Sequence, residues 1–419
     1  MNRTTDAITS RSFQDWLAFL EGLNIAHIEL GLERMGLVAG RLGLLRLPSH
    51  VITLGGTNGK GTTCALLEAM LSAAGHSVGV YSSPHLLDYR ERVRINGESP
   101  SEEAFCAAFS AVEQARGDTA LTYFEFTTLA ALWLFRATAP EVVLLEVGLG
   151  GRLDATNVVD SEQTVITTIA LDHTDWLGPD REAIGFEKAG IFRTGKAAVC
   201  GDPMPPASLL AQAERLGTPL SCVGRDYRWA QQDGSWSFDG LGWRLEGLPL
   251  PALPVMNAAT ALAVLALSPF RIGEEAVRTG LRQARLSGRM QQLEPRLWVD
   301  VAHNPESAAY LAGRLAALPV SGRRLAVVGM LKDKDIAASL APLSPLVDAW
   351  YLAGLGGPRG ASADELARLQ PGGRCFDSVA AALQAAQADC GEQDVVIAFG
   401  SFYTVAEVLA SKAQQPASE

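Results

Sequence analysis

Short, continuous apolar runs recur along the first half of the chain, and they constrain its fold more than any other feature. The segments VITL (51–54), VVLLEVG (142–148) and VITTIAL (165–171) do not alternate apolar and polar residues. Strands of this kind are buried on both faces, as in a parallel sheet covered by helices. Helical spacing from Thr62 to Ala74, ended by Gly75, separates the first run from a further expected strand, HSVGVYSS (76–83). The pattern predicts an α/β protein.

The segment GTNGKGT (56–62) lies between the first expected strand and the first expected helix. Glycines let backbone N–H groups turn around an anion, the helix N-terminus adds its dipole, and Lys60 supplies a charge for the β- and γ-phosphates. The strict G-x-x-x-x-G-K-[ST] form is not met, because position 54 is Leu and Gly61 follows the lysine. We predict a variant ATP phosphate loop; a glycine-rich turn without a catalytic role is the alternative.

The amino-acid composition changes between about Gly201 and Pro254. The segment RDYRWAQQDGSWSFDGLGWRLEGLPLP (225–251) is rich in Trp, Gly and Pro. Short alternating segments there predict small antiparallel strands. A helix is expected from Asn257 to Leu267. The apolar periodicity breaks over 281–296, so we place a hinge linker at 288–295.

A second α/β alternation follows, with a helix that opens at Pro305 and strands expected at 296–303, 325–330, 349–354 and 395–401. The predicted fold class is therefore α/β with two domains. Residues 1–287 would form a P-loop ATPase domain with a mostly parallel sheet and a small antiparallel subdomain. Residues 296–419 would form a Rossmann-like domain.

Composition excludes several classes of protein. The 419 residues carry a net charge of −11 without basic runs, which disfavours nucleic acid as a partner. Six scattered cysteines without a C-x-x-C pair suit a reducing compartment. The polar N-terminus is unlike a secretory signal, and the longest apolar stretch falls short of the ~20 residues of a membrane helix. We expect a cytoplasmic monomer without a membrane partner.

Polar side chains at three expected strand ends indicate a magnesium site, because a triphosphate requires a divalent cation with oxygen ligands. Ser83, Glu146 and His173 each follow an apolar run, and the carboxyl ends of parallel strands converge at one edge of a sheet. Glu146 could instead cap a helix or form an ion pair, and His173 could be structural.

Several motifs together resemble one family: GTNGKGT, YSSPHL, EVGLGGRLDATN, LDHTDWLG, EKAGIFR, NAATAL, SGR and DVAHNP. The chain is similar, from about Trp16 to Val408, to the bacterial dihydrofolate synthase/folylpolyglutamate synthases, two-domain relatives of the Mur ligases. This resemblance implies that ATP phosphorylates the carboxylate of 7,8-dihydropteroate or of a reduced folate. The amino group of L-glutamate would then displace the phosphate from the acyl phosphate. ATP and two Mg²⁺ ions are implied as cofactors.

The resemblance also assigns residues. The ATP site would comprise Thr57, Asn58, Gly59, Lys60, Gly61, Thr62, Asn257, Arg289 and Asp300, and the magnesium ligands would be Ser83, Glu146 and His173. Lys188 matches a carbamylated lysine whose carbamate helps hold a second metal ion; an ion pair with Glu187 or Asp175 is the alternative. The catalytic residues would be Lys60, Lys188, His173 and Asp154.

Three further segments match the pteridine-binding parts of the family: Glu29, Leu30, Gly31 and Leu32; Thr122, Tyr123, Phe124 and Glu125; Leu153, Asp154 and Ala155. Phe124 could stack on the pterin ring and Asp154 could accept its N–H groups, although aromatic residues in such runs are usually core. His303 and Ser401 match glutamate-binding positions.

Three other functions stay open. A Mur ligase for a nucleotide-linked peptide would need a further N-terminal domain, and only about 50 residues precede the loop. A folylpolyglutamate synthase without dihydrofolate synthase activity would not need the pteroate segments. A P-loop switch would not need a metal-site histidine or a second nucleotide-contacting domain.

Overall fold

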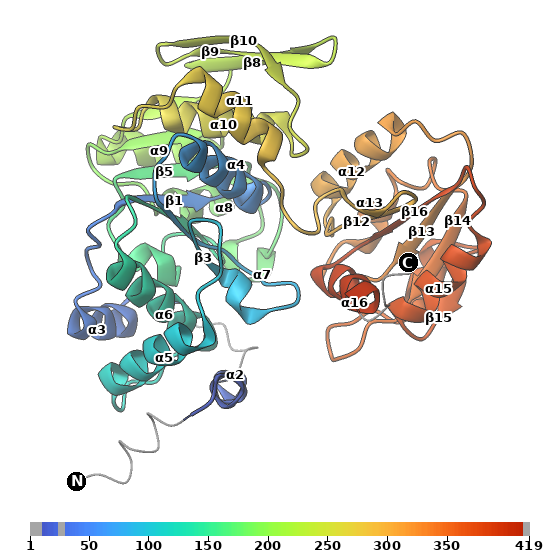
Figure 1. Ribbon diagram of the computed structural model, residues 1–419, viewed down its shortest axis with the longest axis horizontal. Helices are drawn as coiled ribbons and strands as arrows, with labels where there is room; N and C mark the ends of the chain where they lie inside the picture. Colours follow the sequence, from blue (N-terminus) through green and yellow to red (C-terminus); the bar gives the residue numbers. More distant parts are fainter. Residues whose placement is uncertain (1–10, 24–29, 414–419) are drawn as a thin grey trace. The chain divides into compact units, whose positions relative to one another are not determined.

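The computed structural model describes residues 11–23 and 30–413, and the chain divides into two compact units (Figure 1). The first unit extends to His85 and continues from Arg90 to Ala284, and the second comprises Leu86–Tyr89 and the chain from Arg285 onward. Each unit is built around its own mostly parallel sheet, so the predicted α/β class is confirmed.

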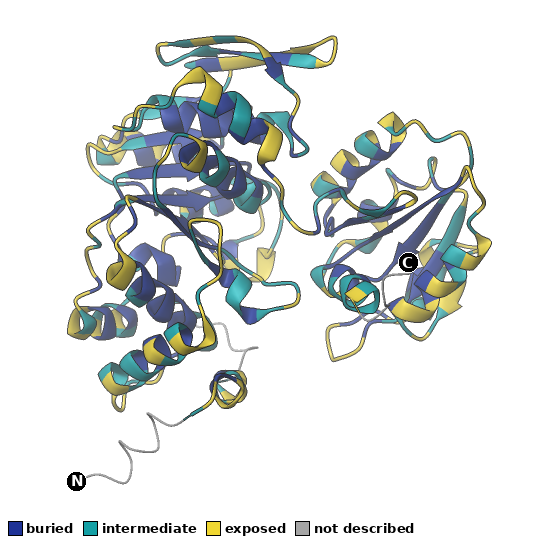
Figure 2. Ribbon diagram, in the orientation of Figure 1, coloured by how far each residue is buried: buried dark blue, intermediate teal, exposed yellow. Residues whose placement is uncertain are grey.

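The sheet of the first unit has seven strands in the order β3-β2-β4-β1-β5-β6-β7. All neighbours run parallel except β2 and β3. The central strands are almost entirely buried (Figure 2), as their continuous apolar runs predict. The strands are β1 His50–Gly55, β2 Val78–Tyr81, β3 Val93–Ile95, β4 Val142–Glu146, β5 Gln163–Ile166, β6 Ala197–Cys200 and β7 Leu220–Cys222.

Helices cover this sheet, and α4, which follows the phosphate loop, packs against α10 and α11. A short 3₁₀ helix, η2 (Ala155–Val158), follows the loop after β4, and another, η1 (Tyr89–Arg92), precedes β3. The α-helices of the unit are α2 Phe13–Gly22, α3 Glu33–Leu42, α4 Lys60–Ala73, α5 Glu102–Arg116, α6 Tyr123–Thr138, α7 Thr174–Leu177, α8 Arg181–Ala189, α9 Ala207–Leu216, α10 Val255–Ala266 and α11 Glu274–Gln283.

Two expectations about this unit were wrong in their residue bounds. The strand expected at 165–171 ends at Ile166, and after it the hydroxyls of Thr167 and Thr168 donate to the carbonyl of Asn58 in the phosphate loop. The region from Gly201 is not wholly antiparallel, since α9 and the parallel strand β7 occupy its first part. Only β8 (Tyr227–Gln232), β9 (Ser235–Gly240) and β10 (Trp243–Pro249) form the small antiparallel sheet.

The second unit has a six-stranded sheet in the order β11-β12-β16-β13-β14-β15, with apolar clusters on both faces. Residues 291–294, expected within the linker, form β11, which pairs antiparallel with β12. The elements are β11 Gln291–Glu294, β12 Leu297–Asp300, α12 Pro305–Ala317, β13 Arg324–Val328, α13 Ile336–Leu340, β14 Ala349–Ala353, α14 Ala363–Leu369, β15 Arg374–Phe376, α15 Val379–Asp389, β16 Val395–Phe399 and α16 Phe402–Ala413. In the part of the chain that the structure describes, no helix is long and apolar enough to span a membrane.

Candidate active site

The phosphate loop connects the end of β1 to the start of α4, as the sequence predicts. Its last residue, Gly59, has a φ of 87° and caps α4 without a side-chain hydrogen bond. A Cβ at this position would lie 2.7 Å from the Asn257 side-chain oxygen, so both the backbone angle and the packing require glycine. The helix therefore begins with backbone N–H groups directed at the loop, which is the arrangement that binds a phosphate.

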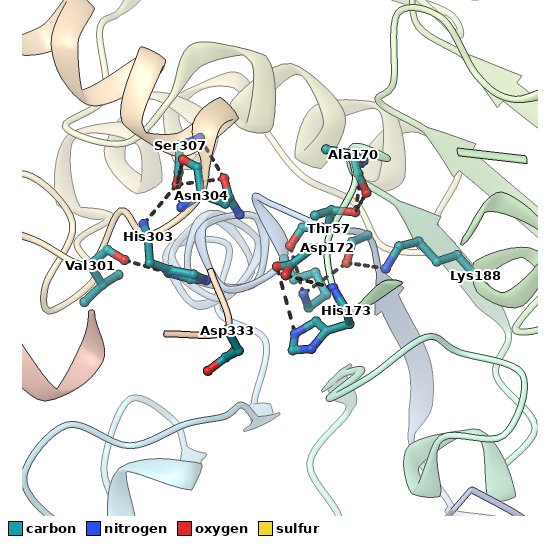
Figure 3. A network of polar contacts seen from close by, with 12 residues as sticks. Thr57, Ala170, Asp172, His173, Lys188, Val301, His303, Asn304, Ser307 and Asp333 are labelled. Carbon is teal, nitrogen blue, oxygen red and sulfur yellow. Dashed lines mark hydrogen bonds and ion pairs between the residues drawn. The ribbon is translucent and has the colours of Figure 1, made fainter. Parts of the chain in front are cut away.

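Side chains on both sides of the loop hold its shape. The Thr57 hydroxyl donates to the Ala170 carbonyl (3.1 Å) and accepts from the Ala170 N–H (3.0 Å), as Figure 3 shows. The Thr62 hydroxyl donates to the Gly59 carbonyl (2.8 Å) and accepts from the amide of Asn257 on α10 (2.6 Å). Asn257, which the family resemblance assigns to the ATP site, thus contacts the loop although it lies 195 residues after Thr62 in the sequence.

Two lysines share one carbonyl of the loop. The Lys60 ammonium donates to Gly56 (3.0 Å) and Thr57 (3.2 Å), and Lys188 on α8 donates to the same Gly56 carbonyl (2.9 Å). Burial, and after it the charge of Lys60, lowers the pKa of Lys188 to about 7. Glu187, an expected ion-pair partner of Lys188, instead pairs with Arg152 at 2.8 Å.

The three expected magnesium ligands follow strands β2, β4 and β5. Glu146 ends β4, is buried, and lies directly opposite Leu54 at the start of the loop. Ser83 follows β2, whose last residue is paired with Leu145. His173 begins α7 with a φ of 52°, its side chain is 41% exposed, and its Nε2 lies 3.9 Å from Asp172. Both carboxylate and hydroxyl oxygens suit a hard cation.

Among the described residues, no three His, Cys, Asp or Glu side chains form a group ready to hold a metal ion. The expected oxygen ligands are Ser83 and Glu146, and magnesium commonly takes its remaining ligands from substrate phosphates and water. The residues present therefore fit a cation that is bound together with a nucleotide.

A cavity of about 300 Å³ lies beside these strand ends and gathers the three expected pteridine segments from distant parts of the sequence. Leu32 is not among its lining residues, and Glu29 lies outside the described residues. The sequence analysis did not identify four of the residues that line it. The lining comprises Leu30, Gly31, Ser83, Pro84, Arg92, Thr122, Tyr123, Phe124, Glu125, Gly148, Leu149, Leu153, Asp154 and Ala155.

Phe124 combines packing with exposure to the cavity. Its ring lies 6.1 Å from that of Tyr81 and rests against the backbone of Gly148, where an added Cβ would come within 2.5 Å of it. An aromatic ring with one face on the protein and another on a cavity can stack on a flat heterocycle. This placement is compatible with the stacking role that we expect.

Asp154 is buried in the loop that follows β4, and both of its oxygens are engaged. One oxygen accepts from the N–H groups of Gly148 (3.1 Å) and Leu149 (2.9 Å), and the other from the N–H (2.9 Å) and hydroxyl (2.6 Å) of Thr156. Burial nevertheless raises the pKa of this carboxyl above its ordinary value. A pterin N–H would have to share these oxygens.

Arg92 is the lining residue with the most distinctive chemistry that the sequence analysis missed. Its Nε donates to His85 (2.8 Å), and its guanidinium carbon lies 5.3 Å from the centre of the Tyr123 ring. Arg92 lies in a run of charged residues, YRERVR, with no spacing that distinguishes it from its neighbours. Only its burial, at 7% exposure, and its contacts identify it.

In the second unit, Asp300 ends β12 and accepts hydrogen bonds from the N–H groups of Met290 (2.8 Å) and Ala302 (2.8 Å). Burial raises the pKa of Asp300, whereas the charge of Arg289 opposes this rise. His303 follows the same strand, and its Nδ1 lies 2.8 Å from the Val301 carbonyl (Figure 3). This contact places the proton on Nδ1 and leaves Nε2 as an acceptor in the neutral ring.

Ser401 follows β16, the strand next to β12, so its loop and that of His303 emerge at one edge of the sheet. It is 2% exposed, and its hydroxyl lies 2.8 Å from the hydroxyl of Thr404 and accepts from the Thr404 N–H (3.0 Å). Thr404 donates in turn to the Gly329 carbonyl after β13 (2.7 Å). Ser401 therefore also has a structural role at the start of α16.

Comparison with known proteins agrees with this architecture. Residues 54–205 match the Mur ligase middle domain, and residues 288–402 match the glutamate ligase domain of Mur ligases. Fold and site thus define a ligase of the Mur type. The chain is 54% identical over 396 residues to the dihydrofolate synthase/folylpolyglutamate synthase of Escherichia coli strain K12, with 94% of each chain covered. It belongs to the dihydrofolate synthase/folylpolyglutamate synthase family.

Solved structures give the same result. E. coli FolC in complex with DHPP and ADP has a TM-score of 0.94 at 53% identity, covering 97% of this chain and 98% of that one. A bifunctional folylpolyglutamate synthase/dihydrofolate synthase with Mn, AMPPNP and L-glutamate bound has a TM-score of 0.92 at 53% identity, covering 97% and 99%. The family resemblance expected from the sequence motifs is confirmed.

Proposed function

We propose that this ATP-dependent ligase joins L-glutamate to 7,8-dihydropteroate and to reduced folates through an acyl phosphate. The observation that carries the proposal is the cavity beside the strand ends of the first sheet, because it brings together parts of the three segments that we expect to bind the pteridine and that lie far apart in the sequence. Solved relatives are described with DHPP and ADP, and with AMPPNP and L-glutamate, which supports these substrate classes.

The chain's residues act mainly by positioning and by neutralising charge, which is what phosphoryl transfer requires. Lys60 and the N-terminus of α4 would bind the ATP phosphates, together with Thr57, Asn58, Gly59, Gly61 and Thr62. Asn257 would complete the nucleotide site of the first unit, and Arg289 and Asp300 would be the ATP contacts that the second unit provides. The phosphorylated carboxylate gains a good leaving group, so the amino group of glutamate can displace phosphate.

Ser83, Glu146 and His173 would hold Mg²⁺, and a carbamate on Lys188 would contribute an anionic ligand for a second ion. Bound Mg²⁺ supplies charge neutralisation on the phosphates. Related structures contain Mn with AMPPNP, which supports a divalent metal beside the nucleotide. The neutral amine favoured by the low pKa of Lys188 is the form that reacts with CO₂.

For the pteridine, Phe124 would stack on the ring and Asp154 would accept its N–H groups, with Leu30, Gly31, Thr122, Tyr123, Glu125, Leu153 and Ala155 completing the pocket. Glutamate would be bound by His303 and Ser401, which follow the neighbouring strands β12 and β16.

The direct test is an assay with MgATP, L-glutamate and 7,8-dihydropteroate that follows phosphate release and product mass. We expect phosphate release that depends on all three substrates, and a product that is heavier by one glutamyl residue. Omission of each substrate in turn is the control. Turnover with a reduced folate but not with dihydropteroate would leave only the folylpolyglutamate synthase activity, and turnover with neither would refute the proposal.

Gly148→Ala tests the role of Phe124. The added methyl group would displace the far end of the ring, which can rotate away at little cost in stability but no longer keeps its place in the cavity. We expect the KM for dihydropteroate to rise roughly tenfold, about 1.4 kcal/mol, with an unchanged KM for ATP.

Gly36→Ala on α3 is a matched control, because a Cβ there meets open space. It should leave both KM values unchanged. An unchanged KM for dihydropteroate in Gly148→Ala would contradict stacking by Phe124.

A further inference from the structure

One ion pair joins two walls of the cavity; its carboxylate residue, Glu125, lines the cavity, whereas its cation, Arg34, does not. Arg34, in the first turn of α3, donates from Nε to both carboxylate oxygens of Glu125, at 2.7 and 2.9 Å. Glu125 lies in the first turn of α6, and its side chain is 4% exposed, against 21% for Arg34. α3 packs against α6 (Figure 1).

On one side, this pair stabilises the N-terminus of α6. The Glu125 carboxylate accepts from the N–H (2.8 Å) and hydroxyl (3.0 Å) of Thr122, and Thr122 caps the helix in return. Tyr123 and Phe124, which line the cavity, lie between these two residues in the sequence. The capping box therefore sets the position of both rings.

On the other side, the pair holds the segment that leads into α3. Leu30 and Gly31 line the cavity immediately before the helix, and the N-cap residue Leu32 provides no side-chain hydrogen bond. The start of α3 thus lacks a capping side chain of its own. Its polar connection to α6 at this end is made by Arg34.

We propose that Arg34 is a positioning residue for the pteridine substrate, because it holds the Leu30–Gly31 wall and the Tyr123–Phe124 wall at a fixed separation. The inference rests on the proposed function, since it assumes that a pteridine occupies the cavity. Without Arg34 the Glu125 carboxylate stays buried without its cation, which favours its rotation toward water and disrupts the capping box. Both walls would then lose their alignment although no lining residue has changed.

The same two helices provide a matched control. At the far end of α6, about 16 Å along its axis from Glu125, Arg136 donates to the carbonyl of Leu42 (2.9 Å) and to that of Gly43 at the end of α3. Arg136→Ala breaks this distal link and leaves the cavity end intact. A change caused by loosened helix packing in general would appear in both variants, whereas a positioning effect would appear in Arg34→Ala alone.

The experiment measures kcat and the KM values for dihydropteroate, ATP and L-glutamate in wild type, Arg34→Ala, Arg34→Lys and Arg136→Ala, with thermal unfolding in parallel. We expect the KM for dihydropteroate to rise about tenfold in Arg34→Ala. A smaller rise is expected in Arg34→Lys, which keeps the charge without the planar guanidinium. The other KM values should stay within about twofold, and Arg136→Ala should match wild type in all of them.

A wild-type KM for dihydropteroate in a folded Arg34→Ala variant would overturn the inference, as would an equal rise in Arg136→Ala. If Arg34→Ala does not fold, the KM for dihydropteroate of Arg34→Lys is the deciding measurement. A wild-type value in that variant would overturn the inference. Absence of dihydropteroate turnover in the wild type would instead refute the proposed function, and the inference with it.

Discussion

Replacing Lys60 by alanine is expected to lower kcat at least 1,000-fold, on the order of 4 kcal/mol of transition-state stabilisation. The ammonium group lies within the phosphate loop, where it donates to the carbonyls of Gly56 and Thr57. A charge held there is positioned for the negative charge that develops on the transferred phosphoryl group. Steady-state kinetics with dihydropteroate and with a reduced folate should show the same loss, if one phosphate loop serves both activities.

Lys196→Ala is the matched control, because Lys196 is an exposed lysine in the same unit, on the turn after α8. It should retain the wild-type kcat. Thermal unfolding of both variants separates lost catalysis from lost folding. A folded Lys60→Ala variant with a kcat within tenfold of wild type would refute the role of this lysine.

Replacing Lys188 by methionine is expected to move activity and stability in opposite directions. Activity should fall at least 100-fold, since the variant cannot form the carbamate that we propose as a metal ligand. Stability in CO₂-free buffer should increase, because the buried amine is replaced by an apolar side chain of similar length. Such a trade-off is typical of residues kept for function.

The pH dependence of the stability gain follows from the pKa of Lys188, which falls from an ordinary 10.5 to about 7 in the folded protein. Between these values the unfolded chain binds a proton that the folded chain does not, so wild-type stability rises with pH across this window. The destabilisation by Lys188 is therefore complete below pH 7 and decreases toward pH 10.5. It amounts to about 5 kcal/mol at most, and the lost hydrogen bond to Gly56 offsets about 1 kcal/mol of the gain.

Urea unfolding of both proteins between pH 6 and about 10 measures this difference. Carbamylation itself is tested with wild type, whose activity should fall in CO₂-depleted buffer and return with bicarbonate. In that reaction the neutral amine forms a bond to the carbon of CO₂ and releases one proton. Equal stability of both proteins at every pH, or activity that is indifferent to bicarbonate, would contradict this account of Lys188.

Much of the first unit could be predicted from local patterns. Continuous apolar runs identified β1, β4 and the start of β5, because a strand buried on both faces can carry few polar residues. The same criterion extended β5 too far. Thr167 and Thr168 resemble strand residues in type, but their hydroxyls bond to the Asn58 carbonyl across the sheet edge.

The site residues, too, could be predicted only in part from the sequence. Glycines and Lys60 between an expected strand and an expected helix predicted a variant phosphate loop, and the family motifs indicated the three pteridine segments. Arg92 and Arg34 could not be found in this way, because arginines usually face solvent. Their importance comes from contacts with residues far away in the sequence, such as the pair between Arg34 and Glu125.

By itself, then, the sequence determined which segments become buried strands, where the phosphate loop lies and which family motifs the chain carries. These properties depend on neighbouring residues, whose spacing decides which side chains leave water. Only the tertiary structure decided that Asn257 contacts the loop, that Lys60 and Lys188 share the Gly56 carbonyl, and that one cavity unites three segments. Such contacts depend on how whole helices pack on the sheet, and burial among them is what lowers the pKa of Lys188.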